Sequence, residues 1–266
     1  MRNIFAILIV IIFPLTVFST AQLGDIIILK NDTLTVFSNP LELRQDIESL
    51  RPRLFGNNSG QTSTDCWRGY IAEWTVIDGE IFLTNIFDCD CKLKADLNKL
   101  FPKEIKNGKI KASWLTDNLY IQKGKMLYYV HGGYESIYEK ELVLTFEKGR
   151  LKSQKELDNS KTHISIYTQQ DRLVGFVQRH INWTNLPDLK GKRLTVYVGC
   201  QTGVSTKPDS IKLLRGVDND LFNKEALRVI SLLPDWDVLY RHGEVCRTKW
   251  NLPVIFDDEW RKKYAR

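Results

Sequence analysis

The side chains that could do chemistry in this 266-residue chain are five cysteines and four histidines. Cys89 and Cys91 are two residues apart, which is half of a zinc-binding pattern, but no second Cys or His pair follows at a suitable spacing. The sequence therefore favours a disulfide from Cys66 to one of the two, with the other cysteine buried or free. The histidines are scattered, at His131, His163, His180 and His242. We predict neither a metal ion nor another bound cofactor.

Nucleophilic catalysis has one weak candidate. Cys66 and His131 could form a thiolate-imidazole pair, because this chemistry needs a base beside the nucleophile. Cys66 stands next to Trp67 in a β-rich segment, however, where burial or a disulfide explains it better. The sequence has neither a Gly-x-Ser-x-Gly elbow nor a phosphate-binding Gly-x-x-x-x-Gly-Lys loop. We therefore expect a protein without catalytic residues.

Aromatic and acidic side chains gather around the flexible Gly132-Gly133 step, between segments that read as strands. This composition would suit a ligand-binding surface. The candidate ligand-binding residues are Tyr129, His131, Tyr134 and Glu135. The alternative is that these aromatic side chains only cover a core at the end of a strand.

The first 21 residues are typical of a signal peptide. An apolar run from Ile4 to Phe18 is followed by small residues at Ser19 and Ala21, which places signal-peptidase cleavage before Gln22. The alternative is an uncleaved N-terminal membrane anchor, but the run is shorter than the roughly 20 apolar residues that span a bilayer. We expect export, and contact with a membrane only if this segment is retained.

The composition of the chain limits the classes of partner. Hydrophobic residues make up 43% of it, enough to fill one large domain or two ordinary ones. The net charge of +6, from 38 basic and 32 acidic residues, is modest for a chain of this length. Nucleic acid is therefore not an expected partner.

The pattern along the chain predicts two domains. Residues 22–155 read as a β-rich domain, with a hairpin whose turn is Asp78-Gly79. The polar residues 156–167 read as a linker. Residues 168–266 then combine a capped helix beginning near Thr168, an alternating strand from Leu194 to Cys200, a helix with one apolar stripe ended by Pro234, and a long strand over 244–256.

Five segments of this last part resemble the C-terminal domain of TonB-family proteins in order and spacing. They are Arg215-Gly216-Val217-Asp218, Lys224–Ile230, Leu233-Pro234-Asp235-Trp236, Gly243 and Leu252–Phe256. Two details depart from the family: Asn185-Leu186-Pro187 replaces its Tyr-Pro element, and residues 199–203 replace an Asp-Gly turn. The chain also has only 8 prolines, too few for a long periplasm-crossing spacer.

The resemblance implies an α+β fold: a mostly β N-terminal domain followed by a TonB-like αβ sandwich with a three-stranded antiparallel sheet. It also implies that an exposed strand pairs with a peptide of an outer-membrane TonB-dependent receptor, or of another envelope protein. On the strand over 244–256, the candidate partner-binding residues are Glu244, Arg247, Lys249 and Trp250.

The resemblance also bears on the two remaining cysteines. Cys200 and Cys246 both fall in the apolar phase of their strands, and the family arrangement would put those strands in one sheet. A Cys200–Cys246 disulfide is therefore possible, and two buried thiols are the alternative.

Together these features predict a periplasmic protein-binding protein of the Gram-negative cell envelope. The alternative function is a secreted enzyme or inhibitor that acts through residues 22–155, with the TonB-like part serving only to dock it.

Overall fold

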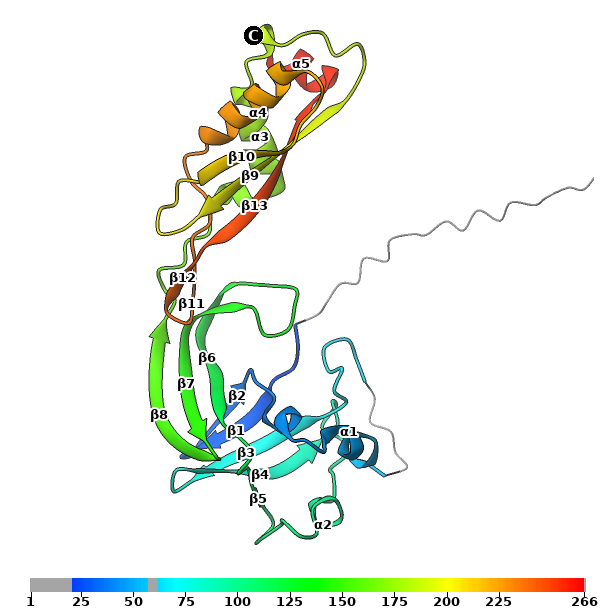
Figure 1. Cartoon of the computed structure of the whole chain (residues 1–266), viewed down its shortest axis with the longest axis vertical. Coiled ribbons are helices and arrows are strands. Elements are labelled where there is room, and N and C mark those ends of the chain that lie inside the picture. The colour runs from blue at the N-terminus through cyan, green and yellow to red at the C-terminus, as the bar shows by residue number, and fades with distance from the viewer. Residues whose placement is uncertain (1–20, 57–61, 266) are drawn as a thin grey trace, which may run out of the picture.

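The computed structural model describes residues 21–56 and 62–265. The expected signal peptide therefore lies, apart from Ala21, outside the described residues. Within the described ranges, no helix combines the length and the apolar character that a membrane crossing needs. The described chain has a barrel at one end and a three-stranded sheet with its helices at the other (Figure 1).

Seven strands close into a β-barrel. All neighbours are antiparallel except β1 and β3, which run parallel, and the short strand β5 (Ile110–Lys111) extends the sheet beyond β4. In ring order the seven strands are β3 (Ile71–Ile77), β1 (Asp25–Leu29), β2 (Asp32–Val36), β6 (Asp117–Tyr128), β7 (Ile137–Glu147), β8 (Arg150–Asp158) and β4 (Glu80–Phe87).

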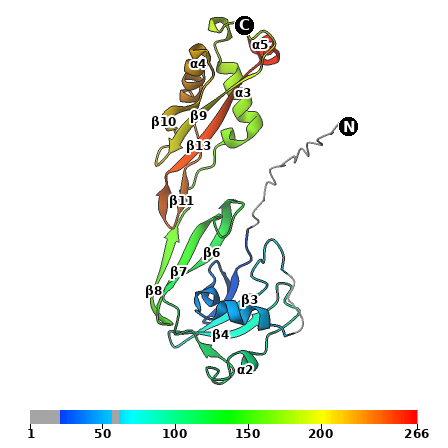
Figure 2. The same ribbon diagram turned by 45° about the vertical axis from the view of Figure 1, so that its right-hand side comes forward.

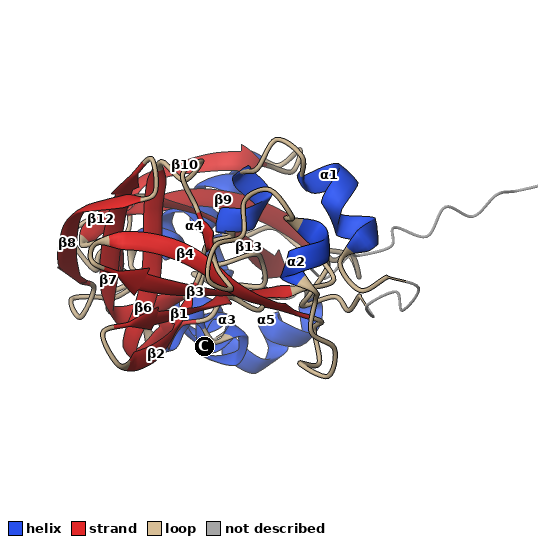
Figure 3. Ribbon diagram, turned by 90° about the horizontal axis from the view of Figure 1, so that it is seen from below, coloured by secondary structure: helices blue, strands red, loops and turns tan. Residues whose placement is uncertain are grey.

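The barrel interior is a packed core. Large side chains such as Trp74, Tyr70 and Phe146 are almost completely buried there. The connections between β2 and β3 and between β4 and β6 carry the short helices of this domain, and Figure 3 shows α1 and α2 on the same side of it. These helices are η1 (Pro40–Leu43), α1 (Ile47–Leu50), η2 (Arg51–Arg53) and α2 (Leu97–Leu100).

The predicted Asp78-Gly79 turn is confirmed. It joins β3 to β4, and both residues have positive φ, 48° and 75°, as a type I′ turn requires. Aspartate and glycine tolerate this backbone conformation better than most residues, which explains why the dipeptide marks the hairpin so clearly in the sequence.

The C-terminal half contains a second sheet, with strand order β10-β9-β13 (Figure 2). Helices α3 and α4 pack on one of its faces, where Val196, Val198 and Val254 are completely buried. The elements are η3 (Ile166–Thr168), α3 (Gln170–His180), η4 (Trp183–Asn185), β9 (Leu194–Thr202), β10 (Asp209–Arg215), α4 (Asp220–Ser231), β13 (Thr248–Phe256) and α5 (Asp258–Tyr264).

A small hairpin joins the two halves. Strands β11 (Leu239–Arg241) and β12 (Glu244–Cys246) lie between the barrel and the second sheet (Figure 1). At the tip, His242 Nδ1 lies 2.7 Å from the buried carboxylate of Glu141, and the Gly243 N–H donates to Asn159 Oδ1 at 2.8 Å. Arg241 forms an ion pair with Glu135. The hairpin thereby attaches the C-terminal half to β7 through Glu141, to the loop before β7 through Glu135, and to the residue after β8, Asn159.

The expected α+β class is wrong. Strands account for 41% of the structure and helices are few, and the closed seven-stranded barrel conflicts with a fold built around an open three-stranded sheet. The physical reason is that closure of the barrel depends on strands that lie far apart in the sequence and pair over only a few residues. Val36 pairs with Ile121, and Glu80 pairs with Arg150. An alternating pattern predicts a strand, but it does not say which other strand lies beside it.

Three predicted boundaries also need correction. Strand β8 runs to Asp158, so the predicted linker over 156–167 begins inside a strand, and it continues through the buried Asn159. Helix α3 begins at Gln170 without the side-chain cap expected at Thr168. The predicted strand over 244–256 is interrupted at Arg247, and its first part pairs with β11 in a separate sheet.

We predict that Gly243→Ala destabilises the protein by about 1 to 2 kcal/mol, because Gly243 has a φ of +75° in a two-residue turn and a Cβ there is strained. The free energy of unfolding from urea denaturation would measure this loss. Gly203→Ala is the matched control, since Gly203 has no positive φ and its nearest neighbour would be 3.9 Å from the added Cβ. Equal stability of the two variants would contradict the prediction.

Candidate functional site

The outer edge of β13 is the candidate site, and Pro253 shows which of its backbone groups face outward. Within the described residues, β13 pairs only with β9, in continuous register from Thr248↔Thr202 to Phe256↔Leu194. Proline has no N–H, so its pair with Tyr197 must be a non-hydrogen-bonded one. Because such pairs alternate along an antiparallel ladder, Lys249 and Asn251 also direct their N–H and C=O groups away from β9.

A side chain of α3 supports this assignment and sets one limit of the site. Gln178 Nε2 donates to the backbone oxygen of Ile255 at 2.8 Å. Ile255 has the same parity as Pro253, so its carbonyl is expected to face outward, where Gln178 reaches it. This hydrogen bond occupies the edge at Ile255, and the open stretch runs from Lys249 to Pro253.

The side chains of the open stretch face solvent. Lys249, Asn251 and Pro253 are exposed. Leu252 and Val254, which alternate with them along the strand, are buried against the helices. Neither Lys249 nor Arg247 has an acidic partner among the described residues, so the stretch is locally basic. It therefore combines unpaired backbone groups with uncompensated positive charge.

The opposite edge of this sheet is less suited to pairing. Strand β10 departs from regular register with β9 between Asp209 and Lys212 and again between Leu213 and Arg215. Ser210, inside the first irregularity, has a φ of +52°. Bulges of this kind twist an edge away from a straight partner strand, so β13 provides the more regular edge.

The structure brings together only part of the predicted partner-binding set. Arg247 and Lys249 lie at the start of the open stretch, but Glu244 belongs to β12, where it pairs with Arg241. Trp250 is half-buried; its Nε1 donates to Thr202 Oγ1 at 3.1 Å and its ring packs edge-on against Trp236. It supports the strand from the covered face. Asn251 and Gln178 were missed, because neither carries a sequence signal for an edge.

The predicted ligand candidates divide into two pairs. Tyr134 and Glu135 line a cavity beside the hairpin tip. Tyr129 and His131 instead pack against each other edge to face, with ring centroids 4.7 Å apart, and they do not line that cavity. The sequence cluster therefore contributes to a cavity wall through its second half only.

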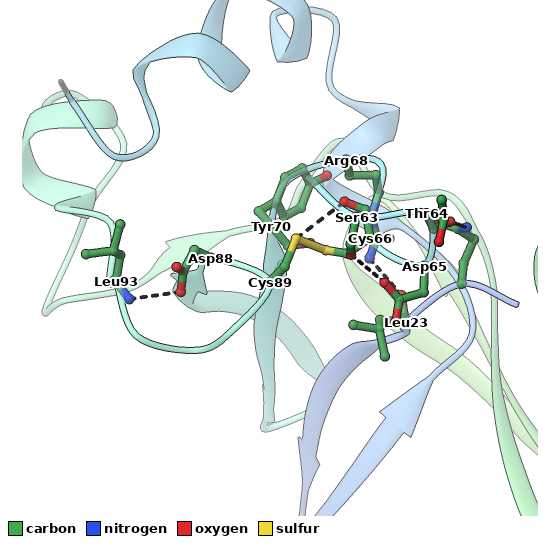
Figure 4. The surroundings of a disulfide bond; sticks show 12 residues. Leu23, Ser63, Thr64, Asp65, Cys66, Arg68, Tyr70, Asp88, Cys89 and Leu93 are labelled. Atoms are coloured by element: carbon green, nitrogen blue, oxygen red, sulfur yellow. Dashed lines mark hydrogen bonds between the residues drawn. A yellow bond between two sulfur atoms is a disulfide. The ribbon is translucent and has the colours of Figure 1, made fainter. Parts of the chain in front are cut away.

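The predicted disulfide within the N-terminal cysteines is confirmed. Cys66 is bonded to Cys89 (Figure 4). Cys91 is free and exposed. The bond joins the turn before β3 to the end of β4, and Cys66 is completely buried. Within the described residues, no group of three or more His, Cys, Asp or Glu side chains could hold a metal ion.

The possible Cys200–Cys246 disulfide is not formed, and both thiols are free. Cys200 lies in β9 opposite Trp250, whereas Cys246 lies in β12 opposite Leu239, in a different sheet. The break at Arg247 explains the separation, because it removes Cys246 from the strand that pairs with β9. Burial raises the pKa of the Cys200 thiol to about 11, with a smaller contribution from Asp209.

Comparison of the chain with protein-family models, with curated proteins and with solved structures finds no match. Its function therefore has to be inferred from its own residues and their geometry.

Proposed function

We propose that this chain is an exported binding protein of the cell envelope, and that the open edge of β13 accepts an extended acidic segment of a partner protein. The observation that carries the proposal is the stretch from Lys249 to Pro253, which is regular and unpaired among the described residues and basic. Strand addition obtains affinity from main-chain hydrogen bonds and specificity from the side chains around them.

The partner strand would bond to a defined set of groups. Lys249 and Asn251 each provide an outward N–H and C=O, and Pro253 provides a C=O alone. Lys249 and Arg247 would favour carboxylates on the partner, chiefly by steering its approach and excluding basic segments. The resemblance to the TonB C-terminal family suggests the partner itself, a peptide of an outer-membrane receptor.

The same features have a second interpretation. Lysine and proline on an edge strand also prevent unwanted pairing between protein molecules. This alternative gives Pro253 and Lys249 a protective role and requires no partner. The two interpretations differ in one measurable respect, which is whether a peptide binds through the backbone N–H of Asn251.

Two features support the proposed location. The Cys66–Cys89 disulfide is of a kind that persists in oxidising compartments, as in the periplasm. The apolar segment over residues 4–18 is typical of an exported chain. We propose a role in binding and assign no catalytic residue.

The test is a titration of the isotope-labelled full chain with a short capped peptide of alternating glutamate and valine. We predict amide shifts at Lys249 and Asn251, and weaker binding of the same peptide with lysine in place of glutamate. Asn251→Pro should lower the affinity roughly tenfold, because it removes one outward N–H.

Asn251→Ala is the matched control, since it removes the same side chain and keeps the N–H. Thermal unfolding of both variants checks that the sheet is intact. Equal peptide affinities of Asn251→Pro and Asn251→Ala, or shifts confined to α4, would contradict strand addition at β13.

A further inference from the structure

We propose a second binding site, in the cavity between the barrel and the hairpin tip, for a neutral, hydroxyl-rich ring compound such as a saccharide. The cavity has a volume of about 500 Å³ and is walled by the segment after β2, by β6, by the loop before β7 and by the hairpin tip. Ligand cavities are common where two structural units meet, and this volume is within their usual range of about 300 to 1,000 Å³. It shares no lining residue with the β13 edge, so this inference is independent of the proposed function.

Aromatic rings form two sides of the cavity. Phe37 and Tyr134 contact each other edge to face with centroids 5.6 Å apart, and both line it. The ring of Tyr120 in β6 lies against the ring of His242 at the hairpin tip, with the ring centroids 4.5 Å apart. Aromatic rings of this kind can pack against the apolar C–H groups on one face of a sugar ring, which form no hydrogen bonds with water.

The observation that points most directly to a ligand concerns Gln122. Its Oε1 is buried and has no hydrogen-bond partner. A buried carbonyl without a partner costs free energy, so native structures usually satisfy it. Gln122 lines the cavity, so a rotation of its carboxamide would bring this oxygen to a ligand hydroxyl that donates to it.

The strand pattern explains why Gln122 faces the cavity and not the core. Leu119 and Ile121 point into the barrel, where both are almost completely buried. Asn118, Tyr120 and Gln122 alternate with them and line the cavity on the other face of β6. Asn118 Oδ1 accepts from Thr145 Oγ1 at 2.8 Å, which leaves its amide nitrogen as a donor for the ligand.

The charges around the cavity are largely paired, which favours a neutral ligand. Glu135 pairs with Arg241, and Glu42 pairs with Arg51. His242 pairs through Nδ1 with the buried Glu141, which lies outside the lining, and this leaves Nε2 for another partner. Asp117 is exposed at the rim and accepts from the Asn118 N–H. Carboxamides and one imidazole therefore remain, and these groups bind hydroxyls by donating and accepting together.

The test uses the full chain and named probes: glucose, N-acetylglucosamine, cellobiose and chitobiose, with glutamate and lysine as charged probes. Saturation-transfer NMR and calorimetry would measure binding. We expect saturable binding of at least one sugar, and weaker or undetectable binding of both amino acids.

Gln122→Met separates a ligand contact from a structural defect. Methionine keeps the length of the side chain and removes the unpartnered oxygen, so the thermal stability should stay equal or rise. Sugar affinity should fall roughly tenfold, because one hydrogen bond to the ligand is lost. Gln154→Met is the matched control, because Gln154 is exposed on β8 and does not line the cavity.

Tyr120→Leu tests the aromatic wall independently and should also weaken sugar binding. The proposal is overturned if none of the sugars binds, if a charged amino acid binds more tightly than the sugars, or if Gln122→Met and Gln154→Met bind sugar with equal affinity.

Discussion

Replacing Cys66 and Cys89 together by alanine is expected to lower the free energy of unfolding by about 3 kcal/mol. The two cysteines are 23 residues apart, and in the chain-entropy model a cross-link over a loop of this size restricts the unfolded chain by that amount. Urea denaturation of the double variant and of the parent chain, both without reductant, would measure the difference.

The native surroundings of this bond should add to the loss. Cys66 belongs to a turn that also contains Ser63 (Figure 4). Its N–H donates to Ser63 O, and its own carbonyl accepts from the Gly69 N–H. The disulfide fixes this turn next to the end of β4. Without it, the turn itself depends on these single hydrogen bonds and on the burial of Arg68 and Tyr70 that follow it.

Cys91→Ala provides the control for the same experiment. Cys91 is exposed and free, so its loss should change the free energy of unfolding by no more than about 0.5 kcal/mol. If Cys91→Ala destabilised the chain as much as the double variant, the bond in solution would involve Cys91 and not Cys89.

The features that the sequence predicts well are local ones. The Asp78-Gly79 turn depends on two adjacent residues, and the alternation of Val196, Val198 and Cys200 depends on one strand with one buried face. The stripe of Phe222, Ala226 and Val229 likewise depends on one helix. Each pattern depends only on which face of one short segment is buried, so it is predicted correctly even when the overall fold is not.

The features that the sequence does not predict are the contacts between distant segments. Barrel closure depends on pairs such as Val36↔Ile121, and no residue type marks them in advance. The break at Arg247 is similar, because the apolar phase continues on both sides of it. Recognition of individual strands was therefore compatible with a wrong fold class, and the end of β8 was assigned to the linker.

The candidate sites show the same division. Tyr134 and Glu135 belong to an aromatic and acidic cluster that the sequence displays, so they could be singled out. Gln122 and Tyr120 belong to an ordinary strand, and they become notable only because the hairpin tip lies beside them. Gln178 acquires its role only through the carbonyl of Ile255, which is 77 residues away.

The buried carboxyl of Asp25 leads to the second large prediction. Asp25 is completely buried inside the barrel wall, where it accepts hydrogen bonds from the Ala72 N–H at 3.1 Å and from Trp74 Nε1 at 3.0 Å. Arg68, also buried, lies 3.4 Å away. Burial raises the pKa of Asp25 to about 6, although Arg68 and the two hydrogen bonds act to lower it.

The sign of the pH dependence follows from this pKa. An unfolded aspartate has a pKa of about 3.9, so between about pH 4 and pH 6 the unfolded chain loses this proton while the folded chain keeps it. The raised pKa of Asp25 therefore does not change the free energy of unfolding below about pH 4. Above that pH it lowers the free energy of unfolding progressively, until the pH reaches about 6. At roughly 1.4 kcal/mol for each unit, the total loss is about 3 kcal/mol.

Asp25→Asn removes this titration, and its comparison with the parent chain isolates it from all other groups. We expect the free energy of unfolding of the variant, relative to the parent, to rise by about 3 kcal/mol between about pH 4 and pH 7. Urea denaturation at a series of pH values measures this difference.

Asp46→Asn is the control with the opposite sign. Hydrogen bonds from Arg44 hold the pKa of Asp46 below its usual value, so its contribution to stability is present above the unfolded pKa and is lost as the pH falls. The relative stability of this variant should therefore fall as the pH rises toward about 4, and it should stay constant between about pH 5 and pH 7, where the Asp25→Asn difference changes. If the Asp25→Asn difference were instead independent of pH, Arg68 and the Trp74 indole would have to compensate the burial of the Asp25 carboxylate completely, and the barrel would hold a stable ion pair in its wall at every pH tested.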